Sequence, residues 1–243
     1  MVVCGLDVAL WVASTLCMLP LWDDAPRRRA ATVTALLIAA NLGVFIYEVL
    51  LASQSDKALS AFLLENALVP KRLLAGLDDL GQWRTVFTAM FLHGGVAHVL
   101  GNCWFLWIFG KNVEDRLGPV RYILFYLISG VGAAALQLVM DSQSALPMIG
   151  ASGAISGVLG GYLVLFPTAW VFTLVPWVVP IVPLPAFVLL LVWFGLQALN
   201  GVGSLVNDSA ARGGVAWWAH AGGFVTGLAL VLWLKSRGWI RKR

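Results

Sequence analysis

Residues 150–161 of the chain read GASGAISGVLGG, and this stretch decides the fold. Glycine recurs at every fourth position here and again near the C-terminus, at Gly153, Gly157 and Gly161 and then at Gly223 and Gly227. In membrane proteins, small residues at this spacing line one helical face and allow two backbones to approach closely. The pattern therefore predicts two apolar helices that pack tightly against each other, with Ser152 at the start of the first.

The composition places these helices in a membrane. Of the 243 residues, 60% are hydrophobic and only 12% are charged, and the mean hydropathy is +0.87. Six stretches are long enough to cross a bilayer core of roughly 30 Å. They are approximately Ala31 to Leu51, Val86 or His93 to Phe109, Tyr122 to Met140, Ser152 to Val171, Ile181 to Asn200, and Val215 to Leu234. We expect an all-α, polytopic membrane protein with one compact six-span bundle.

Within this plan, residues 1–30 form an N-terminal cytoplasmic lead, residues 31–235 the six-span domain, and residues 236–243 a basic cytoplasmic tail. The first 22 residues leave two alternatives open, because they are largely apolar but contain Asp7 and Pro20 and lack a basic n-region. They are either a seventh span or an extension with a misassigned start, the true start being Met18. The cost of placing Asp7 in a membrane favours the second alternative.

The basic residues predict the orientation, because Lys and Arg concentrate in short cytoplasmic loops. With six spans, one side holds Arg27, Arg28, Arg29, Lys111, Arg116, Arg121, Lys235, Arg237, Arg241, Lys242 and Arg243. Both termini are then cytoplasmic, and residues 58–83 form an outer loop that lies in the interface and contacts membrane lipids. The basic residues that raise the pI to about 9.2 are thus explained by the orientation of the protein in the membrane, and no nucleic-acid partner is expected. Compact size without a cleavable targeting segment indicates a bacterial cytoplasmic (inner) membrane, with an organelle membrane as the alternative.

Polar residues gather at the starts of three spans that run in the same direction. The second span begins with His93, His98 and Asn102, the fourth with Ser152 and the sixth with His220. Ionisable groups inside a membrane usually face the bundle interior or a water-filled cavity. The three spans are therefore expected to converge on one polar cavity near the outer side.

This set of residues suits hydrolysis. A serine hydroxyl becomes an effective nucleophile when a neighbouring imidazole takes its proton, so Ser152 and His220 form a candidate pair. Attack on a carbonyl creates an oxyanion, which needs preorganised donors. His98 and Asn102 lie four residues apart on one helical face and could both donate, as could the backbone N–H of Ser152 at a helix start.

Other interpretations exist for each residue taken alone. The glycines could serve packing only, His98 and Asn102 could bond neighbouring helices, and His220 could be a satisfied interior histidine. Histidines from two spans could also hold a haem, as in a b-type cytochrome. The sequence has no His-Glu-x-x-His motif and no acidic partner beside the histidines, which weighs against zinc. The joint occurrence favours hydrolysis, and we expect neither a metal ion nor another cofactor.

The chain also resembles a family, the rhomboid intramembrane serine proteases. The resemblance covers roughly Leu19 to Leu234 and rests on several motifs in order and spacing. They are Trp83-Arg84, His93-Gly94-Gly95-Val96-Ala97-His98-Val99-Leu100-Gly101-Asn102, Gly110 through Glu114 to Gly118, Gly150-Ala151-Ser152-Gly153, and Ala219-His220-Ala221-Gly222-Gly223 with Gly227. It implies a six-span core and a serine endopeptidase that uses a Ser-His dyad without an acid. Its substrates would be peptide bonds in or beside transmembrane segments of other membrane proteins.

The resemblance also implies roles for single residues. Ser152 is the nucleophile, His220 the base, and His98 with Asn102 the oxyanion pair. Near the site, Gly150, Gly153 and Gly223 are structural, and His93 and Arg84 anchor the first loop. The chain departs from the family at Ser156, where some members carry an aromatic ring that stacks on the catalytic histidine. The competing interpretation is a non-catalytic rhomboid-like protein that binds transmembrane helices, although such a protein would be expected to lack Ser152 or His220.

Overall fold

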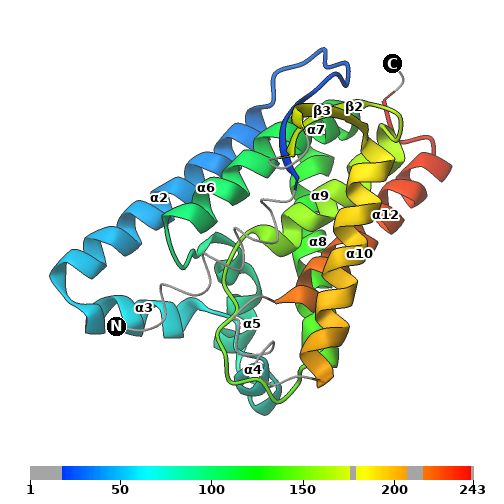
Figure 1. The fold of residues 1–243 in the computed structure, drawn as a ribbon. Helices are drawn as coiled ribbons and strands as arrows, with labels where there is room; N and C mark the ends of the chain where they lie inside the picture. The colour runs from blue at the N-terminus through cyan, green and yellow to red at the C-terminus, as the bar shows by residue number, and fades with distance from the viewer. Residues whose placement is uncertain (1–17, 176–178, 207–215, 242–243) are drawn as a thin grey trace.

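The computed structural model describes residues 18–175, 179–206 and 216–241, and Figure 1 shows a helical bundle with a small sheet at one end. Its elements in chain order are β1 (Leu19–Asp23), α2 (Thr32–Gln54), α3 (Asp56–Asn66), α4 (Pro70–Ala75), α5 (Leu80–Thr88), η1 (Ala89–Phe91), α6 (Val96–Phe105), the π-helical turn η2 (Leu106–Gly110), α7 (Lys111–Leu117), α8 (Pro119–Met140), α9 (Ser152–Leu165), β2 (Trp170–Val175), β3 (Val179–Pro185), α10 (Ala186–Val206) and α12 (Trp217–Ser236). The expected helical bundle is confirmed, and the sheet is an addition that the sequence did not indicate.

Four of the described helices, α2, α8, α10 and α12, are long and apolar enough to cross a membrane. Two further helical segments, Leu80–Phe91 and Val96–Leu117, are together long and apolar enough for one crossing, but they meet at an angle of 81°, as in a broken span or a re-entrant loop. The break falls on residues 92–95, where Gly94 and Gly95 follow His93, and glycine is a poor helix former. Large apolar side chains of α2, including Leu36, Ile46 and Leu50, are exposed, as expected of a surface that contacts lipid. The protein is an integral membrane protein.

Two of the expected spans have different ends in the structure. Helix α9 stops at Leu165 rather than continuing to Val171, and the next helix begins at Ala186 rather than Ile181. Pro167 lacks an amide hydrogen and cannot continue α9. The apolar residues that follow form the antiparallel strands β2 and β3, with Val171 opposite Leu184. An apolar run of this length is equally typical of a buried strand, which explains the error.

Strand β1 joins the same sheet from the N-terminal side. It pairs antiparallel with β2, with Leu19 opposite Leu174. At its end, the buried carboxylate of Asp23 accepts a hydrogen bond of 2.6 Å from the Tyr162 hydroxyl of α9 and lies 3.8 Å from the Lys111 ammonium of α7. The segment before α2 is thereby fixed to the bundle. Of the possible seventh span over residues 1–22, residues 1–17 lie outside the described part of the chain, and residues 19–22 belong to β1.

Helix α2 is held at its start by a residue from another helix. Its N-cap, Ala31, has no side chain that could accept a hydrogen bond from the first turn. The Glu114 carboxylate of α7 accepts instead from the backbone N–H groups of Val33 (2.9 Å) and Thr34 (2.8 Å) and from the Thr34 hydroxyl (2.7 Å). These bonds satisfy orphan donors of the helix start and join α2 to the bundle.

Helix α9 is the centre of the core and contacts α8, α10, α12 and η2. Ten of its 14 residues are buried. On the side facing α12, a Cβ added to Gly223 would lie only 1.9 Å from the Gly153 carbonyl oxygen, and one added to Gly227 would lie 2.0 Å from that of Gly157. The two backbones are therefore in direct contact. The close packing predicted from the glycine spacing is confirmed, and we call this contact the α9–α12 seam.

Candidate active site

Ser152 is the first residue of α9, and the preceding loop brings it beside His98. The loop is fixed by the Gly150 amide, which donates to the Ala89 carbonyl oxygen of η1 at 2.9 Å. Gly150 has φ of +123°, and a Cβ there would lie 2.7 Å from Nε2 of His98 and 3.6 Å from Oγ of Ser152. Only glycine combines this conformation with so close an approach. Gly150 thus allows Ser152 and His98 to share one site.

His220 lies in the first turn of α12, directly across the seam from Ser152. Its Nε2 is 2.9 Å from Oγ of Ser152, within hydrogen-bond distance, and the ring is buried. Gly153 and Gly223, which follow the two residues in their helices, are the pair in closest contact in the seam. The pairing expected from the sequence is therefore present in the structure, and the seam sets its distance.

The length of α9 bears on how deep in the membrane Ser152 lies. With a rise of 1.5 Å per residue, a helix of the length of α9 spans roughly 21 Å, whereas the bilayer core measures roughly 30 Å. The far end of α9 lies beside the sheet, at the end of the bundle where the Arg121 guanidinium donates to the Trp239 carbonyl oxygen at 2.8 Å. If that end reaches the cytoplasmic surface, Ser152 lies about 9 Å inside the opposite surface of the core.

Helix α6 contacts α9 and carries His98 and Asn102 on one face. The Asn102 side chain is 4% exposed, and its Nδ2 atom has no hydrogen-bond partner among the described residues. A buried amide donor without a partner is unusual, because its desolvation is uncompensated. Asn102 therefore has a donor available for a group that enters the site.

His93 is buried and connects three segments of the chain. Its backbone N–H donates to the Glu48 carboxylate of α2 at 3.2 Å, and its Nδ1 donates to the Phe91 carbonyl oxygen at 3.1 Å. Its ring packs edge to face on that of His98, with centroids 5.1 Å apart. His93 thus orients His98 and fixes the break before α6, a position that fits an anchor. Glu48 was not among the expected residues, although a carboxylate inside a span is a signal that sequence reasoning could have used.

Arg84 lies apart from this group. Its Nη2 is 3.3 Å from Oε1 of Glu65, an ion pair that joins α5 to α3 at the surface with both side chains more than half exposed. Exposed pairs of this kind contribute at most about 1 kcal/mol. The structure therefore places Arg84 in the first loop, as a contact between surface helices.

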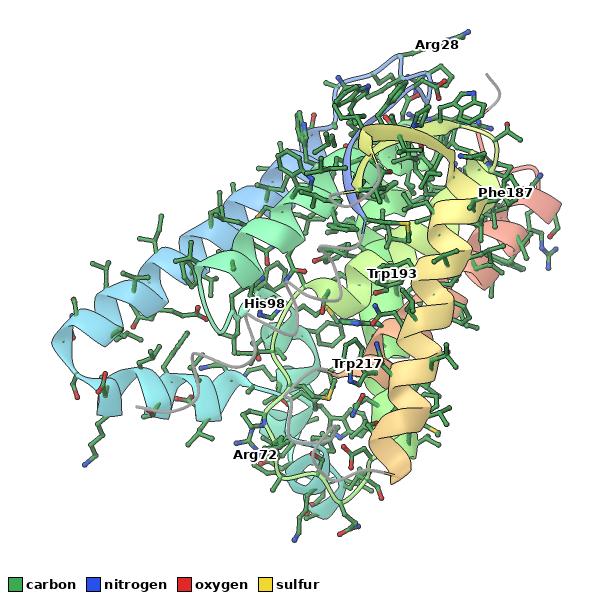
Figure 2. The ribbon with its side chains drawn as sticks, viewed as in Figure 1. Arg28, Arg72, His98, Phe187, Trp193 and Trp217 are labelled. Carbon is green, nitrogen blue, oxygen red and sulfur yellow. The ribbon has the colours of Figure 1, made fainter. Side chains whose placement is uncertain are left out.

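Two tryptophans flank the ring of His220. The Trp193 ring of α10 lies 6.1 Å from it and the Trp217 ring of α12 lies 6.3 Å from it, measured between centroids. Figure 2 labels Trp193 on α10, with Trp217 and His98 also labelled near the middle of the view. Ser156 has no ring to stack on His220, and its hydroxyl donates to the Ser152 carbonyl oxygen at 2.7 Å. Aromatic packing on His220 is thus supplied by α10 and α12 in place of α9.

Gln197 is the second hydrogen-bond partner of His220 and was not among the residues expected from the sequence. Its Oε1 accepts from Nδ1 of His220 at 2.7 Å, and the Gln197 side chain is only 5% exposed. The available signal was a polar residue within the apolar run of α10, since such residues usually face the bundle interior.

A cavity borders Ser152 on the side of α8. Most of its wall consists of small residues, together with two methionines, and it includes Gly130, Ala133, Gly153, Ala219, Met90 and Met148. Among the residues that the structure describes, no group of three or more His, Cys, Asp or Glu side chains is placed to hold a metal ion. The groups described here that could take part in a reaction are therefore the serine, the histidines and the amides.

These features define a class: a polytopic helical membrane protein that holds a hydrogen-bonded Ser-His pair, with a buried amide on the adjoining helix α6 whose donor has no partner among the described residues. Residues 80–237 match the family model described as the Rhomboid domain. The chain belongs to the rhomboid family.

Curated relatives agree with this assignment. The chain is 32% identical over 180 residues to RHOMBOID-like protein 6, mitochondrial, of Arabidopsis thaliana, an alignment that covers 72% of this chain and 50% of that protein. It is 36% identical over 134 residues to Rhomboid protease GluP of Bacillus subtilis (strain 168), covering 54% of this chain and 24% of the relative. It is 30% identical over 142 residues to Rhomboid protease AarA of Providencia stuartii, covering 53% of this chain and 49% of that protein. The chain thus spans half or less of the length of these relatives.

Proposed function

We propose that the protein is an intramembrane serine endopeptidase that hydrolyses peptide bonds in or beside transmembrane segments of other membrane proteins. The observation that carries this proposal is the 2.9 Å contact between Oγ of Ser152 and Nε2 of His220, which lies part-buried in a bundle that includes four membrane-length helices among those described. Membership of a family that includes proteins named as proteases supports it. The activity would belong to residues 31–235, within which both groups lie.

The proposed reaction follows from the hydrogen bond. Ser152 attacks the carbonyl carbon of the scissile bond while its proton passes to Nε2 of His220. His220 then gives that proton to the leaving amine, and the acyl enzyme is hydrolysed when water attacks with His220 again as the base. The oxyanion formed in each half is stabilised by the Asn102 amide, the His98 imidazole and the Ser152 backbone N–H at the start of α9.

The cavity beside Ser152 suggests which substrates fit. The cavity next to the nucleophile has a volume of about 50 Å³, which leaves room only for a small side chain. We propose that the residue next to the scissile bond has a small side chain. Because the relatives include proteins named mitochondrial and chloroplastic beside bacterial ones, the bacterial inner membrane stays a prediction from the sequence.

The test is cleavage of a single-span model substrate by the purified protein, reconstituted in lipid vesicles, with and without a metal chelator. We expect cleavage within or beside the span and no effect of the chelator. A folded protein that is inert towards a panel of such substrates would contradict the proposal and favour a non-catalytic helix-binding protein. Activity that the chelator removes would instead indicate metal-dependent chemistry.

Asn102→Ala is expected to lower kcat by about 10²- to 10³-fold, the usual cost of removing one oxyanion donor. The measurement is kcat and KM on the model substrate, and KM should change little because the oxyanion forms only in the transition state. Asn66→Ala is the matched control, since the Asn66 amide donates to the Phe62 carbonyl oxygen of its own helix. Equal rates for Asn102→Ala and wild type would remove Asn102 from the site.

A further inference from the structure

Gln197 is a buried polar side chain in the apolar helix α10, and it faces the proposed catalytic base. Its Oε1 lies 2.7 Å from Nδ1 of His220, on the side of the ring opposite Ser152. Both side chains are less than 10% exposed. Trp193, one helical turn before Gln197, packs on the same imidazole ring. One face of α10 therefore determines both the stacking and the hydrogen bonding of His220.

The chemistry of this contact determines where the imidazole proton lies. An amide oxygen can only accept, so Nδ1 of His220 must be the donor. A neutral imidazole carries one N–H, and Nε2 is then left with a lone pair directed at the Ser152 hydroxyl. The opposite tautomer, with the hydrogen on Nε2, would place an N–H against the Ser152 hydroxyl. The hydroxyl proton would then have no base to accept it. The Gln197 oxygen thus selects the tautomer that the reaction requires.

We propose that Gln197 is a positioning residue that fixes the tautomer and orientation of His220, completing a Ser152–His220–Gln197 relay in which a neutral amide occupies the place of a carboxylate. The inference rests on the proposed function. In soluble serine hydrolases a buried Asp or Glu does this work. Inside a membrane an ionised carboxylate is costly, whereas an amide offers the same acceptor without a charge. A Ser-His pair that has no acidic residue beside it can therefore still have a third residue, a neutral amide, that holds the histidine.

The first test separates positioning from simple packing. Gln197→Met keeps the side-chain length and removes the acceptor, and Gln197→Glu keeps an acceptor. We expect Gln197→Met to lower kcat by about 10- to 100-fold with KM and thermal unfolding unchanged, because only the base is affected. Gln197→Glu should retain most of kcat. The control is Asn200→Met on the same helix, whose side chain is exposed, and which should behave as wild type.

The pH profile gives a readout that packing would not move. A carboxylate at position 197 stabilises the imidazolium, so the acid limb of kcat/KM should shift to higher pH in Gln197→Glu only. Among the residues that the structure describes, the other titratable group that acts on His220 is His98 of α6, and it is present in every variant, so the comparison isolates position 197. Full activity in Gln197→Met, or a loss that follows unfolding or KM, would overturn the inference.

A second measurement does not depend on cleavage. The chain has only three histidines, so ¹⁵N-labelled histidine gives few imidazole signals, which His93→Gln and His98→Gln variants assign. In the wild type we expect the single imidazole hydrogen of His220 to lie on Nδ1. In Gln197→Met we expect two neutral tautomers that interconvert, one with the hydrogen on Nδ1 and one with it on Nε2. The Nε2–H tautomer in the wild type would overturn the inference. A fixed Nδ1–H in a protein that cleaves nothing would instead reject the proposed function alone.

Discussion

Replacing Ser152 by alanine is expected to abolish cleavage of the model substrate, with a loss of about 10³-fold or more in kcat. Removal of the nucleophile leaves no group that can form the acyl enzyme, and comparable changes in serine hydrolases cost several orders of magnitude. Ser152→Ala adds no atoms, so the fold should be kept and thermal unfolding should match the wild type. His220→Ala should be equally inactive, and the double variant no worse than either, because the two residues act as one unit.

The matched control is Ser156→Ala, one turn further along α9. That hydroxyl is also buried, but it donates to the Ser152 carbonyl oxygen within its own helix. Activity should therefore stay within a few-fold of the wild type. A serine-directed fluorophosphonate should label the wild type and Ser156→Ala but not Ser152→Ala. Residual cleavage by Ser152→Ala, or equal losses in both variants, would disprove the assigned nucleophile.

The second large effect concerns stability. Gly227→Ala is expected to destabilise the protein by about 3 kcal/mol, the upper end of the range for overpacking. The added methyl group would overlap the Gly157 carbonyl oxygen, and the contact is backbone on both sides, so no side chain can move aside. Helix α12 must shift from α9, which also separates His220 from Ser152. Thermal unfolding in detergent and the rate of cleavage should both fall.

Gly43→Ala provides the comparison. Gly43 lies within α2, and an added Cβ there has no neighbour within 4 Å. The same substitution should be neutral or stabilise by up to about 1 kcal/mol, because alanine is the better helix former. If Gly227→Ala unfolded at the wild-type temperature with full activity, the α9–α12 seam would not be as close as the structure has it.

Most of the bundle and the main pair could be predicted because a membrane restricts the possibilities. Backbone groups in lipid must be satisfied within helices, so apolar runs of about 20 residues translate almost directly into spans. The cost of polar groups in the same medium makes Ser152, His98 and His220 conspicuous. Glycine spacing then indicated which helices touch. The apolar runs, the polar residues within them and the glycine spacing can each be read from a short stretch of sequence, and each has few physical alternatives.

The sheet and Gln197 could not be predicted in the same way. After Leu165 only Pro167, Thr168 and Thr173 break the apolar run up to Val175, so hydropathy alone cannot show that the chain changes from helix to strand. Strand β1 depends on pairing with β2, a partner about 150 residues away in the chain. For Gln197 the polar signal was present, but its partner depends on how α10 is rotated against α12. That rotation is set by packing between helices, and no short stretch of the sequence reveals it.

The α9–α12 seam has a consequence for how this protein can change over time. Backbones already in contact cannot be brought closer or separated by exchanging one apolar side chain for another elsewhere. Substitutions on the lipid-facing surfaces of α2, α8 and α10 can therefore accumulate without altering the distance between Oγ of Ser152 and Nε2 of His220. Divergence is then free to proceed in the surrounding loops and on the outer surface of the bundle, while the spacing of Ser152 and His220 is inherited unchanged with the glycines.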